Sequence, residues 1–558
     1  MKRKFMCLFL ALAMALSCFA FVGCSSDEDE TVEGGTTDET ALTTVTLTLW
    51  IPTGKNTTED AILAVQEAIN KITKAKFETA IELHAIPENK YDEAIDARIT
   101  EIEEKIAFEA AEAERKRQEA KELAAQGITT AVEETTAAEE TTAAEEETYV
   151  NDIGMTVLKY PEVEETQMDI FLVRGLDNYK AYIERAALSA LDSELNGTSK
   201  ILKQYIYPTF LSKAKIGSTY AIPNNHVIGE YKYLLVNKAL VEKLYWDPEE
   251  LTTLTACKDF ILDVKNFTTV TPMLAEAETS GMHYWSEKDG DWSLLASRVP
   301  NEITADTTVG LQHTYSIGEY TDTISMMKHL KEAGCIATDA SKVKEFGVAV
   351  VSGDAALPAQ YEEDYYVYVH EKPMATTDDI YGSMFAVSAY TKSVARSMEI
   401  ITMLNTDPEL RTILQYGVED VHWQIDEKDE DVIKVISKAY QMNLRDTGNV
   451  YMTYPAAGVP MTYWDSCKQQ NLDSLVSPFL GFSHADYYTE ETAADFKALS
   501  ELSKSYAARV AAMTAAEFDE QLLDLKIELN NNDLILKMTN SAPEAGVVTP
   551  ASLFAKHK

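Results

Sequence analysis

The spacing of hydrophobic residues near the start of the chain follows two periods, and each period predicts one kind of element. Residues 45–50 alternate in character at every second position and are rich in β-branched side chains, which predicts a β-strand. Apolar residues then recur every three or four positions across residues 62–72, and the helix that this predicts ends at about Lys74. A second strand is predicted at about residues 77–85. Strand, helix and strand in this order indicate an α/β unit on a parallel sheet.

A long charged segment interrupts this pattern. Residues 90–126 predict one helix, and its second half carries charges on all sides, so little of it can be buried. Residues 128–148 then repeat Thr, Ala and Glu without any Lys or Arg, a composition typical of disorder. We therefore interpret residues 105–148 as an insertion that loops out of the first domain. A coiled-coil arm that binds a partner is the alternative, but the apolar heptad repeat that such an arm needs is missing.

The α/β pattern resumes after the insertion. Residues 168–173 form a short apolar run suited to a buried strand, and residues 174–179 form the loop at its end. Further strands are expected at residues 231–237 and 381–387, and a helix is expected at residues 393–405. The last hundred residues are expected to be largely helical.

The composition narrows the classes of function. With 558 residues, of which 46% are hydrophobic, the chain is long enough for two or three domains with sizeable cores. Its net charge of −42 argues against nucleic acid as a partner, because phosphates need a basic surface, and also against docking on anionic lipid. Beyond the N-terminal segment, no apolar run of the sequence is long enough to span a bilayer.

The first residues of the chain predict export from the cell. Residues 1–23 combine a basic start, a long apolar run and a small residue, Gly23, directly before Cys24, which is the pattern of a secretory signal rather than of a spanning helix. This pattern resembles a bacterial lipoprotein signal, which implies a lipid on Cys24 and a location on the extracellular face of the bacterial cell membrane. An ordinary secretory signal with an incidental cysteine is the alternative. Residues 24–44 are expected to form a flexible acidic spacer.

The sequence motifs give no sign of catalysis. The chain has no P-loop, no G-x-S-x-G elbow and no dinucleotide glycine fingerprint. Its histidines lack the spacing of a metal site, so we expect no metal and no cofactor. Cys257, Cys335 and Cys467 are expected to be buried thiols, although a disulfide between two of them stays open. We predict that the chain is not an enzyme; a glycoside hydrolase and a cell-surface adhesin are the alternatives from other classes.

Four local motifs occur in one order and carry a family resemblance. Residues 216–224, Ile-Gly-Ser-Thr-Tyr-Ala-Ile-Pro-Asn, resemble the G-K-x-Y-A-I-P segment of extracellular solute-binding proteins of family 1, which feed ABC importers. Residues 233–240 resemble the L-x-Y-N-K-x-L strand of that family, and residues 386–410 resemble its return segment of strand, loop and helix before T-D-P-E. Residues 416–423, Tyr-Gly-Val-Glu-Asp-Val-His-Trp, are similar to the Y-G-I-E-G-V-H-Y of large lipoprotein members. The resemblance covers nearly the whole mature chain outside the 105–148 insertion.

The resemblance implies a type II periplasmic-binding-protein fold, in which two α/β lobes are joined by crossing hinge strands and hold a ligand in the cleft between them. Lobe one is expected at residues 45–235 and 376–455, lobe two at residues 236–375 and 456–540, and a tail at residues 541–558. The implied function is to capture an oligosaccharide or related carbohydrate by lobe closure and to deliver it to the permease subunits of an ABC importer. The protein is expected to be a monomer that binds the membrane only through its lipid. A component that binds peptides or other solutes is the alternative.

The expected ligand contacts are of two kinds. Aromatic rings pack on the apolar faces of sugars, and a few placed polar groups pair with the hydroxyls. The aromatic candidates are Trp50, Tyr179, Tyr231, Trp285, Tyr361, Tyr381 and Trp464. The polar candidates are Arg174, Asp177, Asn224 and Glu230. Trp50, Tyr179 and Asn224 are the strongest of these, because they lie at strand ends or in loops that match cleft segments of the family.

Overall fold

The computed structural model describes most of the chain from residue 44 onward. The described ranges are residues 44–125, 148–150, 156–275, 282–284, 294–298, 311–337, 340–477 and 492–541. The predicted signal with Cys24, the spacer, most of the predicted disordered part of the insertion, Trp285 and the tail lie outside these residues. All described elements belong to one compact unit. Within the described ranges, no helix combines the length and the apolar composition that a membrane crossing requires.

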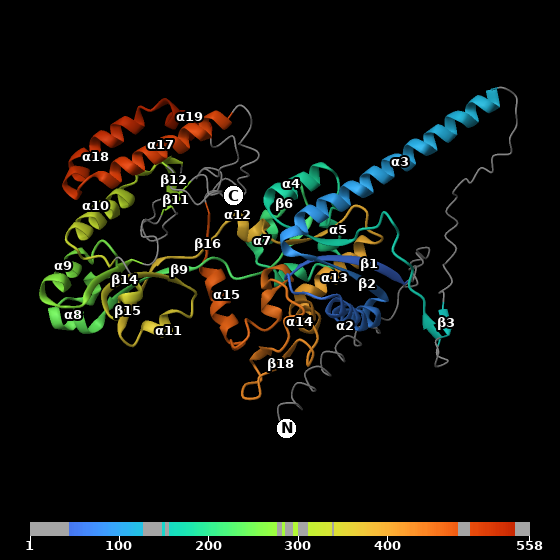
Figure 1. Cartoon of the computed structure of the whole chain (residues 1–558), viewed down its shortest axis with the longest axis horizontal. Coiled ribbons are helices and arrows are strands. Elements are labelled where there is room, and N and C mark those ends of the chain that lie inside the picture. The colour runs from blue at the N-terminus through green and yellow to red at the C-terminus, as the bar shows by residue number, and fades with distance from the viewer. Residues whose placement is uncertain are drawn as a thin grey trace, which may run out of the picture. The chain divides into compact units, whose positions relative to one another are not determined.

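Strands from distant parts of the chain meet in a five-stranded sheet (Figure 1). Its strands, in spatial order, are β2 (Thr79–Pro87), β1 (Val45–Thr53), β5 (Ile170–Val173), β17 (Met384–Val387) and β8 (Ala221–Pro223). The neighbours β2, β1 and β5 run parallel, whereas β17 runs antiparallel to β5 and β8. The carboxyl ends of β1 and β2 therefore lie at one edge of the sheet, where ligands of α/β sheets usually bind.

Helices cover this first sheet and bury its apolar residues in one core. They are α2 (Glu59–Phe77), α3 (Tyr91–Ala125), α4 (Leu176–Glu184), α5 (Asp192–Asn196), α6 (Leu202–Tyr205), α7 (Pro208–Lys213), α13 (Val394–Thr406) and α14 (Pro408–Tyr416). Helix α2 begins at Thr58, whose hydroxyl accepts a hydrogen bond from the Ala61 N–H, and it has acidic residues in its first turn and lysines in its last. Both features stabilise the ends of a helix.

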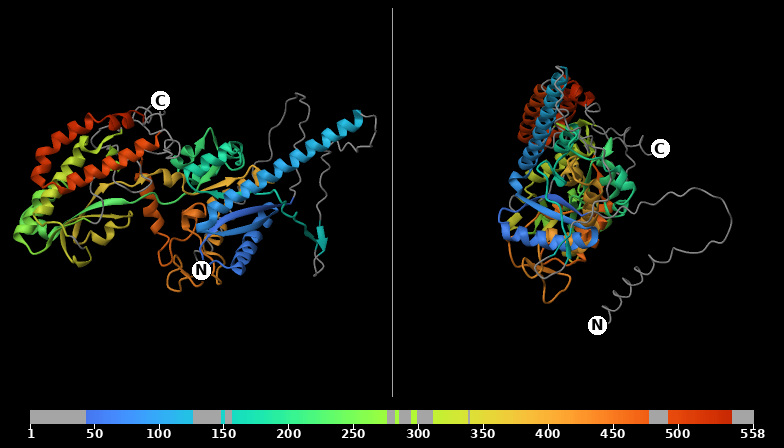
Figure 2. Two further views of the ribbon diagram at one scale, coloured as in Figure 1. Left: turned by 45° about the horizontal axis from the view of Figure 1, so that its top comes forward. Right: turned by 90° about the vertical axis from the view of Figure 1, so that its right-hand side faces the viewer.

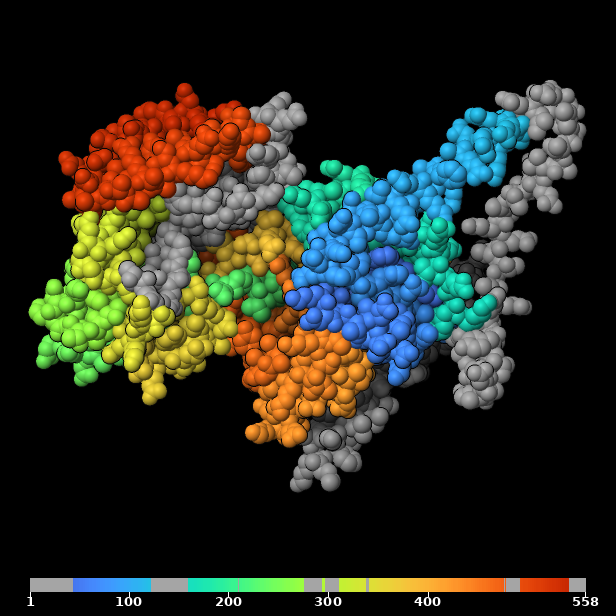
Figure 3. Space-filling model, viewed as in Figure 1, coloured from blue at the N-terminus to red at the C-terminus, as the bar shows by residue number. Residues whose placement is uncertain are grey.

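The second half of α3 projects beyond the first sheet (Figures 1 and 2). This is the charged part of the helix that the sequence predicts for residues 90–126, and Phe108 is exposed on it. The space-filling view shows this half standing clear of other described side chains on the visible face (Figure 3). The next described residues form the short antiparallel pair β3 (Thr148–Val150) and β4 (Thr156–Leu158), which begins at the last residue of the predicted insertion.

A second, four-stranded sheet is built mainly from the middle of the chain. Its strands, in spatial order, are β10 (Thr271–Ala275), β14 (Phe346–Gly353), β9 (Tyr231–Asn237) and β15 (Tyr365–Glu371). Its helices are α8 (Lys238–Leu244), α9 (Lys258–Phe267), α10 (Gly318–Glu332) and α11 (Pro358–Tyr361). Cys257 and Cys335 are buried in its core, and both of them, like Cys467, are free thiols rather than disulfides. Burial raises the pKa of the Cys257 thiol to about 12, which leaves this thiol inert.

A helical layer and several small elements complete the described chain. Helices α17 (Ala493–Ala512), α18 (Ala515–Asn530) and α19 (Asp533–Ser541) form the helical layer, and α18 packs against α10 (Figures 1 and 3). The small strands are β6 (Lys215–Ile216), β7 (Ser218–Thr219), β11 (Met282–Tyr284), β12 (Leu295–Arg298), β13 (Gln312–His313), β16 (Met374–Ala375), β18 (Trp423–Ile425), β19 (Ile433–Val435) and β20 (Leu475–Val476). Two further helices, α12 (Thr377–Tyr381) and α15 (Tyr463–Asp473), lie beside the segments that connect the two sheets.

The structure differs from the sequence prediction at three boundaries. Strand β1 continues past Trp50 to Thr53, so Trp50 does not end its strand. The strand predicted from Tyr381 begins only at Met384, because a capping box between Thr376 and Asp379 starts helix α12 and places Tyr381 in it. Strand β9 pairs only with β14 and β15, so the chain leaves the first sheet between Pro223 and Tyr231, before the predicted lobe boundary after residue 235.

Candidate ligand-binding site

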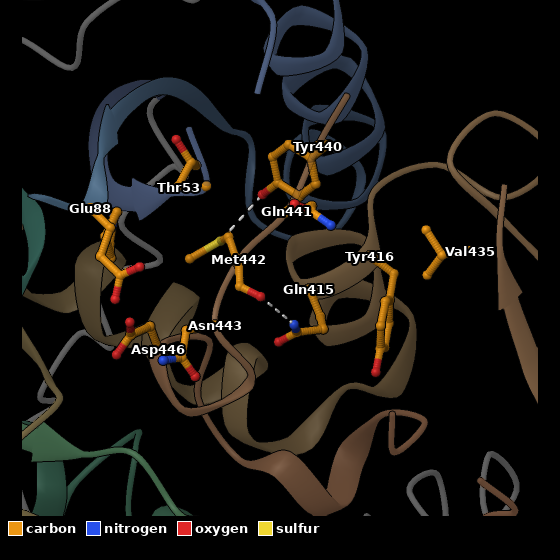
Figure 4. A pocket seen from close by; sticks show the side chains of 12 residues that line it. Thr53, Glu88, Gln415, Tyr416, Val435, Tyr440, Gln441, Met442, Asn443 and Asp446 are labelled. Atoms are coloured by element: carbon orange, nitrogen blue, oxygen red, sulfur yellow. Dashed lines mark hydrogen bonds between the residues drawn. The ribbon is translucent and has the colours of Figure 1, made fainter. Parts of the chain in front are cut away.

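A pocket of about 390 Å³ opens at the carboxyl end of β1 (Figure 4). It is formed by the end of β1, the 3₁₀ turn Glu88–Lys90 after β2, the end of α14 and an extended segment before the 3₁₀ turn Leu444–Asp446. The lining residues are Pro52, Thr53, Gly54, Glu88, Gln415, Tyr416, Val435, Tyr440, Gln441, Met442, Asn443 and Asp446. Its volume lies in the usual range for small-molecule sites.

Backbone contacts hold the walls of this pocket together. The Gly54 N–H donates to the Gln441 carbonyl at 2.8 Å, and the Thr58 N–H donates to the Ala439 carbonyl at 2.9 Å. A Cβ at Gly54 would lie 3.2 Å from the Cβ of Gln441, so glycine permits this close approach. The loop after β1 and the segment around Gln441 are thus joined directly by backbone hydrogen bonds.

Polar side chains gather on one side of the pocket. Figure 4 shows the carboxylates of Glu88 and Asp446 and the amide of Asn443 on this side. Glu88 and Asn443 are exposed to solvent, whereas Asp446 is only 4% exposed. Burial raises the pKa of the Asp446 carboxyl above its usual range, although a hydrogen bond with Ser383 and the positive charge of Arg174 act in the opposite direction. This side therefore offers both donors and acceptors to a ligand.

Aromatic and apolar side chains form the opposite side. The half-buried Tyr416 donates from its hydroxyl to the carbonyls of Tyr454 and Pro455, at 3.1 and 2.5 Å. Burial raises the pKa of Tyr416 to about 12, so this hydroxyl stays protonated and its ring keeps one position. Tyr440 is fixed in the same way by its bond to the Leu414 carbonyl at 2.8 Å. A polar side that faces a rigid aromatic side is an arrangement suited to binding a small molecule.

A buried arginine supports the floor of the pocket. Arg411 is fully buried, and its guanidinium donates to Gln415 Oε1 at 3.2 Å and to the Leu444 carbonyl at 2.9 Å. Gln415 in turn donates from Nε2 to the Met442 carbonyl at 2.9 Å. Burial lowers the pKa of Arg411 to about 9. The guanidinium thus holds the pocket segment directly at Leu444 and through Gln415 at Met442.

Two of the residues predicted from sequence lie next to this pocket. Arg174 donates from Nε and Nη2 to the two Asp92 carboxylate oxygens at 2.9 and 2.8 Å, and from Nη2 to the Glu88 carbonyl at 3.2 Å. Asn224 donates from Nδ2 to the Ser383 hydroxyl at 2.9 Å. Since Ser383 also bonds Asp446, Asn224 reaches the pocket through one intermediate side chain. Both residues position pocket groups in this structure.

Three predicted aromatic residues are buried and hydrogen-bonded within the protein. Tyr179 donates to the Ala214 carbonyl at 2.8 Å, Tyr381 to the Lys213 carbonyl at 2.7 Å, and Trp464 to the Thr453 carbonyl at 2.7 Å. Each of the three is less than 5% exposed, so none presents a ring face to solvent here. Their roles as ligand contacts stay predictions.

The other candidates are dispersed. Trp50 is half-buried and stacks on His84 with ring centroids 4.1 Å apart, two residues before the pocket begins. Asp177 lies exposed in the first turn of α4. The remaining three are associated with the second sheet or with the connection to it: Glu230 is exposed, Tyr231 is buried and donates to Asp473 at 2.8 Å, and Tyr361 packs near Tyr365.

Most pocket residues have no counterpart among the sequence predictions. Glu88, Gln441, Asn443 and Asp446 stand in loops without a recognisable motif, so their grouping depends on the fold. Tyr416 is different, because it begins the segment that is similar to Y-G-I-E-G-V-H-Y in the family. That similarity is the one sequence signal for this wall of the pocket.

Comparison with known proteins agrees with this fold. No family model matches the chain. A carbohydrate ABC transporter substrate-binding protein of Streptococcus pneumoniae is 24% identical over 328 residues, which cover 55% of this chain and 65% of that protein, just under two thirds of its length. The crystal structure of the N-glycan transport solute-binding protein from Streptococcus pneumoniae has a TM-score of 0.53 at 16% identity and covers 90% of this chain and 98% of that one. In sequence and in fold, the chain is thus similar to solute-binding proteins of ABC transporters.

A second solved structure supports the same fold. It is a solute-binding protein from Bifidobacterium longum infantis that is described as HMO-binding and as associated with an ABC transporter. Its TM-score is 0.50 at 11% identity, with coverage of 91% of this chain and all of that one. The mixed α/β periplasmic-binding-protein fold predicted from the sequence is thereby confirmed.

Proposed function

We propose that this protein is a solute-binding protein that captures an oligosaccharide or related carbohydrate for an ABC importer. The observation that carries the proposal is the pocket at the end of β1, where exposed carboxylate and amide groups face the fixed ring of Tyr416. Hydroxyl groups of a sugar donate and accept hydrogen bonds, so they match this mixture of groups, and the apolar faces of sugar rings match the aromatic wall. The name of the Streptococcus pneumoniae relative, a carbohydrate ABC transporter substrate-binding protein, supports the same substrate class.

In this proposal the two sheets are the cores of two lobes that close on the ligand. Binding energy shifts the population towards the closed form, because ligand contacts from both lobes exist only there. The permease subunits of the importer then recognise the closed form and receive the sugar. The protein acts as a monomer, makes no covalent bond to its ligand and uses no cofactor or metal.

We also propose that the mature protein is held at the extracellular face of the membrane by a lipid on Cys24. The support is the order of basic start, apolar run and Gly23-Cys24 in the sequence. Labelled palmitate is expected to enter the wild-type protein and not the Cys24→Ser variant. Equal labelling of both proteins would contradict the anchor and leave the binding function untouched.

A ligand screen tests the function directly. Thermal unfolding is measured with neutral oligosaccharides, short peptides and polyamines, because a ligand that binds only the native state raises its stability by about 2.7 kcal/mol at a hundredfold excess over Kd. We expect a higher midpoint with one glycan series and no release of smaller sugars. Stabilisation by peptides alone would instead establish the alternative, a peptide-binding importer component. Cleavage of the glycan would contradict a binding protein.

A further inference from the structure

The chain passes from the first sheet to the second through residues 224–230, which belong to neither sheet. This crossing segment, as we call it, is largely buried up to Ile228. Backbone N–H and C=O groups that leave a sheet and remain buried need other partners. In a hinge protein these partners decide how stiff the connection is.

Two amide side chains of α15 supply the partners. Asn471 accepts from the Ile228 N–H at 2.8 Å through Oδ1 and donates to the His226 carbonyl at 2.7 Å through Nδ2. Gln470 donates through Nε2 to the carbonyls of Ile228 and Gly229, at 2.8 and 2.6 Å. Gln470 is fully buried and Asn471 is 4% exposed. Consecutive residues of one helix thus replace a strand partner along this segment.

Helix α15 is itself attached to both sides of the connection. Towards the second sheet, Gln470 Oε1 accepts from the Ala355 N–H at 3.0 Å, and the Tyr463 hydroxyl donates to Asp354 at 2.8 Å, directly after β14. Towards the first sheet, the Trp464 indole donates to the Thr453 carbonyl at 2.7 Å, on the segment that follows the pocket. The helix therefore joins the pocket segment, the crossing segment and the second sheet.

The other connections lie beside the same helix. Strands β16 and β20 pair in parallel, with the Leu475 N–H donating to the Pro373 carbonyl at 2.8 Å. Gly229 touches this pair, since a Cβ on it would lie 3.2 Å from the Met374 N, and its φ of +47° lies in the left-handed region. Gly229, which directly follows Ile228 in the crossing segment, is thus a residue that tolerates a positive φ.

We propose that Gln470 and Asn471 are positioning residues for lobe closure. They hold residues 226–229 in one backbone conformation, so that rotation between the sheets is confined to residues on either side of that segment. This inference rests on the proposed function, since only a protein that closes on a ligand needs a defined hinge. Hinge residues commonly absorb backbone rotation at a few positions, and rigid neighbours keep the rotation at those positions.

The test measures the distribution of distances between one label on each lobe, in protein without added ligand. Nitroxide labels are placed at Leu63→Cys on α2 and Phe267→Cys on α9, whose native side chains are 56% and 68% exposed, in the mature chain with Cys24→Ser. The three native thiols of the described chain are buried. Pulsed dipolar spectroscopy then gives the distance distribution for the parent and for Asn471→Leu, which removes both hydrogen bonds at similar volume. We expect the population of alternative distances to rise about tenfold, the factor that corresponds to losing one or two ordinary hydrogen bonds.

The controls separate hinge positioning from general loss of structure. Gln469→Leu removes an amide side chain two residues before Asn471, at an exposed position where the contact described for it is with Asp473 at 3.1 Å. Its distance distribution should match that of the parent. If Asn471→Leu does not fold, Asn471→Asp keeps the acceptor for Ile228 and loses the donor to His226, and a smaller broadening is expected. An unchanged distribution in a folded variant at position 471 overturns the proposal. Failure of the glycan screen leaves this measurement intact, so the two proposals fail separately.

Discussion

The pocket at the end of β1 and the crossing segment beside α15 both contain Asn and Gln side chains, but these amides have different surroundings in the two places. In the pocket, Gln441 and Asn443 are exposed, so a ligand can reach them, and Asn443 Oδ1 also accepts from the Arg445 N–H at 3.1 Å. At the crossing segment, Gln470 and Asn471 are buried, and all of their polar atoms have protein partners. A satisfied buried amide fixes one conformation, whereas an exposed one is available for recognition. Residue type alone therefore does not distinguish binding from positioning in this protein.

The largest expected effect comes from removing a large side chain beside the crossing segment. Trp464→Ala should lower the free energy of unfolding by about 3–5 kcal/mol, because the indole is buried and bonded to the Thr453 carbonyl. Urea unfolding at neutral pH measures this loss. Tyr245→Ala is the control, since Tyr245 is 96% exposed and should change stability little. If instead stability is retained and glycan affinity falls, Trp464 is the ligand contact that the sequence predicts.

The second-largest effect should be a lower affinity for the glycan with an unchanged free energy of unfolding. Glu88→Gln removes the charge of an exposed pocket carboxylate, and hydrogen bonds to charged groups are worth about 1.5–3 kcal/mol, or roughly ten- to a hundredfold in Kd. Titration calorimetry with the glycan from the screen measures it. Glu67→Gln, at an exposed position of α2, is the matched control. Equal affinities of the two variants would remove Glu88 from the site.

The fold can be predicted from the sequence because its elements are local. The period of residues 45–85 indicates strand, helix and strand, and β1, α2 and β2 occur there. The composition of residues 90–126 indicates a charged helix, which appears as α3. The apolar pattern misplaces the start of the strand at residue 381, since it does not reveal that Thr376 and Asp379 form a capping box.

The site is harder to predict because it depends on contacts between distant segments. The pocket joins residues from β1 with residues nearly four hundred positions later, and the Gly54–Gln441 backbone bond that brings them together leaves no pattern in the sequence. The sequence favours aromatic residues near strand ends as ligand contacts. Tyr179 and Tyr381 instead donate to backbone carbonyls in the core, where a tyrosine needs such a partner. Among the pocket residues, Tyr416 is the first residue of a motif that the sequence reveals, although it is not among the predicted ligand contacts.

The smallest effect should distinguish the buried carboxylate of Asp446 from the half-buried carboxylate of Asp379 by the sign of their pH dependence. Burial raises the pKa of Asp446, so its contribution to stability is present at low pH and is lost as the pH rises through that raised pKa. Relative to the wild type, Asp446→Asn should therefore gain stability as the pH rises from the unfolded pKa of about 3.9 through the raised folded pKa. Burial also acts to raise the pKa of Asp379, but hydrogen bonds from His226 and Thr376 outweigh it and lower the pKa.

Asp379→Asn consequently serves as the control with the opposite sign. Its ionised carboxylate stabilises the folded protein above the unfolded pKa of about 3.9, and this stabilisation is lost as the pH falls through the lowered folded pKa. The Asn variant should thus lose stability relative to the wild type as the pH rises to about 4, and the difference should then stay constant towards neutral pH. Urea unfolding of the three proteins at acidic, weakly acidic and neutral pH measures both differences. If the stability differences of the two Asn variants changed with pH in the same direction, the Asp446 carboxylate of the pocket would be stabilised in its ionised form like that of Asp379 beside the crossing segment. That result would contradict the contrast between a binding region and a positioning region for these two charged groups.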